Sequence, residues 1–243
     1  MVNAGSRIAF CAFALLAPVC SGAAGSVAGI PVKHRFAGAP LALHSPVVRE
    51  GKTIAVTRLE YLVSGLRVEA ADGAWHRATE TVALLNPAED RVTLPTAGLP
   101  PRPWRRIAFD IGVQPGPNHG DTAQWPPDHP LHPLSSNLHW DWRQGYVFIA
   151  IEGTIRDAAT PRAPFLYHVG GGDLLREVSM EIPPPLADQP LAIAFDLDRI
   201  WSGAAAIDPL EDGGFTHSRE GDPLARRLAD NLAGCFSVVA NAQ

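Results

Sequence analysis

Short runs of alternating apolar residues, separated by proline and glycine, limit how this chain can fold. The 243 residues include 23 prolines and 22 glycines, which favour many turns and leave little room for long helices. In an alternating run, successive side chains point to opposite faces, as in a strand buried on one side. Such runs occupy residues 54–63, 107–113, 178–182 and 191–197. The rhythm predicts a β-sandwich or a barrel.

Three local signals refine this prediction. The alternation slips by one residue at Arg58, which predicts a β-bulge. Asp72-Gly73 follows a further alternating stretch and is typical of a hairpin turn. The run Tyr146–Ile151 is almost continuously apolar, as expected for a central strand covered on both faces.

One helix is predicted, near the C-terminus. Asp222 and Pro223 supply an N-cap and a first-turn proline. The apolar residues that follow are spaced to lie on one stripe of a helix: Leu224, Leu228, Leu232 and Phe236. Cys235 lies beside that stripe and is expected to be a small buried residue. The predicted fold is therefore mostly β, an antiparallel β-sandwich with one C-terminal α-helix, in one domain over residues 25–243.

The first segment has the pattern of a secretory signal peptide. Arg7 is its only charge, residues 8–19 are apolar, and small residues follow at 21–25. We expect cleavage near Ala24, so that residues 1–24 are the signal peptide and the protein is periplasmic or secreted. The apolar run is too short to span a bilayer, and no later segment is apolar enough, so we expect no membrane span. Cys235 then stands alone, without an internal disulfide.

Charge and motif content argue against two large classes of function. The formal net charge is −5, with no clustered basic residues, so nucleic acid is not expected as a partner. The chain has no GxSxG nucleophile motif of the kind that serine hydrolases use.

Histidines gather in and just after a long proline-rich stretch, residues 115–136. They are His119, His129, His132 and His139. A loop this long in a compact domain is usually functional or disordered, and Trp125 within it favours function. Imidazole is a common ligand of copper and zinc, although no HExxH or CxxC pattern is present. His168 stands apart, at the predicted end of a strand that runs into three glycines.

Several short motifs stand in a defined order along the chain. They are Leu59-Glu60-Tyr61-Leu62-Val63-Ser64-Gly65-Leu66, Ile111-Gly112-Val113, Pro117-Asn118-His119, Pro130-Leu131, Trp140-Asp141-Trp142-Arg143-Gln144-Gly145-Tyr146-Val147-Phe148 and Phe165-Leu166-Tyr167-His168-Val169-Gly170. Together they resemble the MbnP-like family over most of the mature chain. Each motif alone is weak, and their order gives the resemblance its specificity. A branch of that family has a cysteine shortly after the second histidine, where this chain has glycines, so its disulfides are not expected here.

The resemblance implies an exported copper-binding protein without catalytic residues of its own. Its expected partners are a MauG-like di-haem enzyme, encoded beside many members, and methanobactin, whose operons encode some of them. His119 and His168 match the family's two histidine ligands, and Trp125 is the expected third metal-site residue, oxidised to kynurenine by the di-haem partner. His34, on the first mature strand, and His129, His132 and His139 remain open as further ligands.

Two other functions remain open on the residues alone. A sandwich binding module would use Trp125, Trp140 or Trp142 as an aromatic platform for a small ligand or glycan. A metal-dependent enzyme would use open copper positions for redox chemistry.

Overall fold

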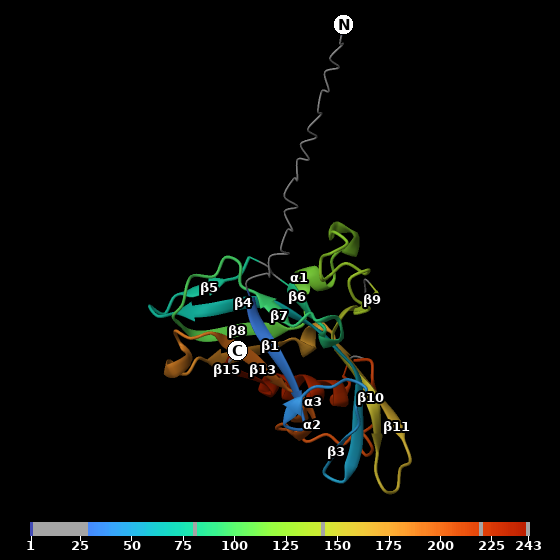
Figure 1. Ribbon diagram of the computed structural model, residues 1–243. Helices are drawn as coiled ribbons and strands as arrows, with labels where there is room; N and C mark the ends of the chain where they lie inside the picture. Colours follow the sequence, from blue (N-terminus) through green and yellow to red (C-terminus); the bar gives the residue numbers. More distant parts are fainter. Residues whose placement is uncertain (2–28, 80–81, 142–143, 219–220, 242–243) are drawn as a thin grey trace.

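The computed structural model describes residues 1, 29–79, 82–141, 144–218 and 221–241. Its strands form two sheets that share one apolar core, and Figure 1 shows how they cross. Apart from Met1, the expected signal peptide lies outside the described residues. Within the described ranges, no helix has the length and apolar character needed to cross a bilayer.

The larger sheet has ten strands. Its main path is β12 (Arg176–Glu181), β8 (Trp104–Ile111), β4 (Lys52–Ala70), β10 (Gly145–Arg156), β11 (Ala163–Gly170) and β14 (Phe215–Thr216). Shorter strands pair with β4 or β10, namely β3 (Val47–Arg49), β5 (Trp75–Arg77), β6 (Val82–Leu85) and β9 (His139–Asp141). The strand runs expected from the sequence are thus confirmed, including β10 as a central strand covered on both faces, since every residue from 146 to 151 is buried.

Strand β4 is long because it serves two groups of partners. Its first half pairs with β3 and β10, and its second half with β5, β6 and β8. The register with β10 shifts where Glu152 faces Arg58 and Gly153 faces Val56. The bulge predicted at Arg58 is therefore confirmed. The hairpin at Asp72-Gly73 is confirmed too, since it joins β4 to β5 and Gly73 has a φ of +88°.

The smaller sheet contains the first and the last of the described strands. Its strands are β15 (Phe236–Ala240), β13 (Leu191–Asp196), β1 (Gly29–Phe36) and β2 (Ala39–Pro40), with β7 (Thr93–Pro95) also on β1. Most pairs in both sheets are antiparallel, as expected. The β1–β13 and β11–β14 pairs are parallel, and each joins segments far apart in the sequence.

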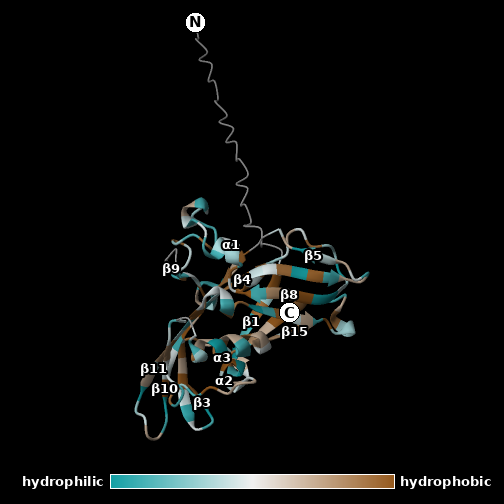
Figure 2. Cartoon of the chain, turned by 180° about the vertical axis from the view of Figure 1, so that it is seen from behind, coloured by the Kyte–Doolittle hydropathy of each residue, from teal (hydrophilic) through white to brown (hydrophobic). Residues whose placement is uncertain are grey.

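Aromatic rings hold the two sheets together. Tyr61 of β4 stacks on Phe195 of β13 at 5.3 Å between ring centroids, and Phe109 of β8 lies 5.2 Å from Phe236 of β15. Figure 2 shows the hydrophobic residues running along β4 and β8. Burying such rings is the main favourable contribution to folding.

Short helical segments connect the strands. They are α1 (Pro115–Asn118), α2 (Asp198–Ser202) and α3 (Pro223–Leu232), with 3-10 turns η1 (Pro87–Glu89), η2 (Thr122–Gln124), η3 (Gly172–Leu174), η4 (Pro184–Leu186) and η5 (Ala233–Cys235). Helix α3 is the predicted C-terminal helix, and the Asp222 carboxylate accepts hydrogen bonds from Leu224 N and Ala225 N.

The predicted helical stripe extended too far. Leu224, Leu228 and Leu232 are buried on α3 as expected, but Phe236 belongs to β15. Phe236 is buried by its contacts across the sandwich, so its helical spacing from Leu232 is coincidental. Cys235 is buried as expected, with 1% of its surface exposed, and burial raises the pKa of its thiol.

Candidate metal centre

The outer face of β4, β10 and β11 presents two adjacent rows of side chains. Residues paired across neighbouring strands share a face of the sheet. One row therefore runs from Glu60 through Ala150 to His168. The next row runs from Arg58 through Glu152 to Leu166. Ala150 leaves space between the larger side chains on either side of it.

An ion-pair network orients His168 on this face. The Oε1 atom of Glu152 accepts hydrogen bonds from His168 Nε2 at 2.9 Å and from Arg58 Nη1 at 2.7 Å. Arg58 also donates to Glu60 at 2.8 Å. Burial opposes ionisation of Glu152, but the hydrogen bonds from His168 and Arg58 outweigh it and hold the pKa of Glu152 below its usual value. A histidine held by a carboxylate is the usual arrangement behind a metal ligand.

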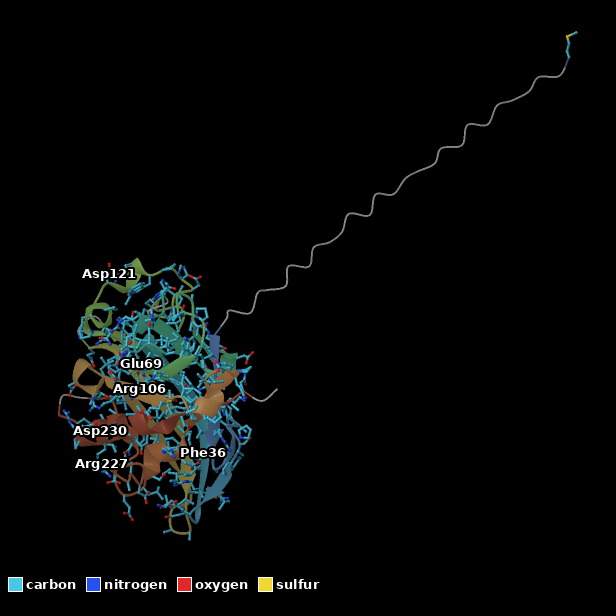
Figure 3. All side chains as sticks on the ribbon, turned by 90° about the vertical axis from the view of Figure 1, so that its left-hand side faces the viewer. Phe36, Glu69, Arg106, Asp121, Arg227 and Asp230 are labelled. Atoms are coloured by element: carbon cyan, nitrogen blue, oxygen red, sulfur yellow. The ribbon has the colours of Figure 1, made fainter. Side chains whose placement is uncertain are left out.

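The segment between β8 and β9, residues 112–138, folds over the same outer face. We call it the histidine loop. It contributes Val113, Leu131 and Leu138 to a second apolar cluster. The strand residues of this cluster are Leu62, Val82, Leu84, Tyr146, Val147, Phe148 and Ala150. The long irregular stretch expected from the sequence is therefore a packed element with a small core of its own. In Figure 1, α1, β6 and β9 lie together at one end of the molecule, and in Figure 3 Asp121 marks the loop there.

Trp125 is the central aromatic residue of the histidine loop. Its ring stacks on His129 at 4.1 Å between centroids, and it packs against the second apolar cluster. Its Nε1 atom is buried and has no hydrogen-bond partner. Leaving such a donor unsatisfied costs about 1–3 kcal/mol, and a buried unsatisfied group of this kind is a reason to look for a function.

His119 follows α1 and is exposed. Its Nε2 lies 3.3 Å from Nδ2 of the preceding residue, Asn118. Asn118 is 1% exposed, and its Oδ1 accepts a hydrogen bond from Tyr146 N at 2.9 Å. Gly145 makes this approach possible, because a Cβ there would lie 2.6 Å from Asn118 Oδ1. The start of β10 thus fixes the position of His119.

The remaining histidines left open by the sequence contact other parts of the protein. Nδ1 of His129 and of His132 each accepts a hydrogen bond from a backbone N–H two residues later, at 3.1 Å. His139 lies edge-on to Tyr146. His34 is in the core between the sheets, 2.9 Å from the Tyr61 hydroxyl. Burial lowers the pKa of His34 to about 4.

The three residues singled out by the sequence approach the same half of β10 by separate routes. His119 is tied to Tyr146 through Asn118, Trp125 packs on the cluster that includes Ala150, and His168 pairs with Ala150. In the described part of the chain, no hydrogen bond or ring contact joins their side chains directly. Over the same residues, no three His, Cys, Asp or Glu side chains form a metal-binding group.

One nearby histidine was missed by the sequence reasoning. His217 lies beside His168, with ring centroids 5.2 Å apart. It stands alone between Thr216 and Ser218, 49 residues beyond His168 in the printed sequence, and no local motif marks it. His217 can be placed next to His168 only from the pairing of β11 with β14. Of the tryptophans considered for an aromatic platform, Trp142 lies outside the described residues.

The structure is that of a two-sheet, mostly antiparallel β-sandwich protein whose outer face bears His168 and the packed histidine loop. The sequence profile of the MbnP family matches residues 26–213, so the chain belongs to the MbnP family. MbnP from Methylosinus trichosporium has a similar fold, with a TM-score of 0.56 and 16% sequence identity. The match covers 88% of this chain and 98% of that one. No curated protein matches the chain in sequence.

Proposed function

We propose that this protein is an exported copper-binding protein that serves copper homeostasis in methanobactin-associated systems. Membership of the MbnP family supports the link to methanobactin. The apolar N-terminal segment supports export. In this proposal the chain binds copper and is the substrate of a MauG-like di-haem enzyme. It performs no catalysis itself.

The main support for the proposal is that the histidine loop and β11 both contact β10. The histidine loop and β11 come from different parts of the chain, yet the loop packs on the outer-face cluster next to His168. His168 is already oriented by Glu152, as a metal-binding imidazole usually is. Imidazoles suit copper well, because copper(II) has the highest affinity of the first-row divalent ions for such donors. His119 and His168 are the residues that would hold it.

Trp125 would become a metal ligand only after oxidation of its side chain. An indole N–H is a hydrogen-bond donor only, and here Nε1 is buried without an acceptor. Oxidation with two oxygen atoms, from dioxygen or peroxide, cleaves the indole C2–C3 bond, and hydrolysis then releases C2 as formate. The product, kynurenine, carries an aromatic amine that can donate to a metal. The di-haem partner would process the oxidant.

The same contacts weaken the aromatic-platform alternative. His129 covers one face of the Trp125 ring, and both Trp125 and Trp140 pack on the second apolar cluster. A ligand platform needs an accessible ring face, so these two side chains are poorly placed for that role.

Copper titration of the mature protein tests the proposal. We expect stoichiometric binding by the wild type, and its loss in the double variant His119→Ala, His168→Ala. The double variant His44→Ala, His76→Ala removes two histidines outside the site and is the matched control. Equal binding by all three proteins, or by none, would overturn the assignment of these ligands. Mass spectrometry after incubation with the di-haem partner and peroxide locates the expected oxidation at Trp125.

A further inference from the structure

His217 is placed beside His168 by strand pairing. Strand β14 runs parallel to β11, with Leu166 opposite Phe215 and Tyr167 opposite Thr216. One further step along both strands brings His217 next to His168. Their ring centroids are 5.2 Å apart and their planes are inclined by 71°.

The backbone on both sides of His217 is tied down. The Ser218 hydroxyl donates to His168 O at 2.8 Å and accepts from Gly170 N at 2.9 Å. Ser218 N donates to Thr216 Oγ1 at 3.1 Å, and the Thr216 hydroxyl donates to the Asp222 carboxylate that caps α3. The His217 ring itself is exposed. These bonds hold its backbone to β11 while leaving its side chain open to a ligand.

His168 presents one nitrogen to its surroundings. Its Nε2 donates to the Glu152 carboxylate, so in the neutral ring the lone pair is on Nδ1. Glu152 is also held by Arg58 at 2.7 Å. Glu152 therefore acts on His168 as an orienting partner, and the next donor on this face is the imidazole of His217.

The separation of the two rings suits one shared ion. With metal–nitrogen bonds of about 2 Å, two imidazoles on one ion place their centroids roughly 4.5–6.5 Å apart. The observed 5.2 Å falls in that range. Two rings that met only for packing would gain more by burial, whereas His217 is exposed.

We propose that His217 is a copper ligand that acts with His168, so that the β11 side of the site supplies two imidazoles. This rests on the proposed function, in which His168 binds copper. It adds a donor that the order of sequence motifs does not include, and it places the donor on the segment that leads into α3.

Copper(II) titration with electron paramagnetic resonance tests this assignment. The variant His217→Gln keeps a polar side chain of similar length, and His76→Gln, an exposed histidine on β5, is the matched control. We expect His217→Gln to raise the Kd for copper(II) by roughly tenfold or more and to remove one nitrogen from the hyperfine pattern. We expect the control to match the wild type. Circular dichroism checks that both variants fold.

The outcomes separate the two proposals. Unchanged affinity and nitrogen count in His217→Gln, with binding abolished in the His119→Ala, His168→Ala variant, would overturn the role of His217 and leave the proposed function intact. Absence of copper binding in the wild type would overturn both. Loss of a nitrogen in His217→Gln alone supports the ligand assignment.

Discussion

At the scale of single residues, the histidines of this protein divide by what surrounds them. His168 lies on the outer face against a carboxylate, whereas His34 lies between two sheets against Tyr61 and Phe195. The carboxylate orients the His168 ring through a hydrogen bond, whereas the apolar core disfavours a charged His34 ring. His34 is therefore suited to packing and His168 to ligand binding, although both stand on strands and look alike in sequence.

The burial of His34 makes stability depend on pH. Its pKa in the folded protein is about 4, below the ordinary value of 6.5. Between these values the unfolded chain binds a proton that the folded chain does not, so stability rises with pH across this window, by about 3 kcal/mol. We expect urea unfolding midpoints to increase between pH 4.5 and 7 in the wild type. In His34→Gln, which keeps a polar group near Tyr61, the increase should be smaller. Identical pH profiles would show that His34 does not titrate in this way.

At the scale of elements, the histidine loop depends on one side chain. Asn118 accepts a hydrogen bond from the buried N–H of Tyr146 at the start of β10. We expect Asn118→Ala to lower the free energy of unfolding by about 1–3 kcal/mol, because that N–H loses its acceptor. Copper affinity should fall as well, since His119 is positioned through Asn118.

His119→Ala is the matched control, because it removes the neighbouring exposed side chain and leaves the Asn118–Tyr146 hydrogen bond in place. Urea unfolding of the two variants and the wild type compares them directly. If Asn118→Ala is as stable as His119→Ala, the Asn118–Tyr146 hydrogen bond is not what anchors the loop.

Elements defined by local chemistry could be predicted from the sequence. The bulge at Arg58, the turn at Asp72-Gly73 and the helix start at Asp222 each follow from residues within a few positions. The end of α3 could not, because Phe236 continues the helical spacing while Tyr61 and Phe109, which it contacts, lie across the sandwich. The three residues expected at the metal centre approach one face, but the neighbour of His168 was unpredictable. His217 reaches it through a parallel pair that leaves no local pattern.

At the scale of the whole molecule, the core and the candidate site occupy different faces of the same strands. Tyr61 of β4 points into the space between the sheets, and its neighbour Glu60 points to the outer face. The rings between the sheets supply stability, and the second apolar cluster supports the loop that bears His119 and Trp125. Residues at the site can therefore change with little effect on the shared core. Changes in the shared core are expected to disturb the site, because β4 and β10 contribute residues to both.

The C-terminal segment completes that core, although it lies beyond the region matched by the family. The match ends at residue 213, whereas β15 forms the edge of the smaller sheet next to β13. Phe236 of β15 lies 5.2 Å from Phe109 and 4.8 Å from Phe195 between ring centroids. Removing β15 would expose these rings and leave β13 as an unpaired edge, which favours aggregation.

We therefore expect a chain that ends at residue 221 to lose cooperative unfolding. Loss of one buried phenylalanine side chain alone costs about 3–5 kcal/mol, which is comparable to the whole stability of many domains, and this truncation also removes α3. A chain ending at Ala240 keeps both elements and is the matched control. Thermal unfolding followed by circular dichroism compares the two. If the shorter chain melts cooperatively at the same temperature, the region matched by the family is a self-sufficient domain, and α3 and β15 are additions to it. If only the longer chain melts cooperatively, the sandwich of this protein needs the segment that contains α3 and β15.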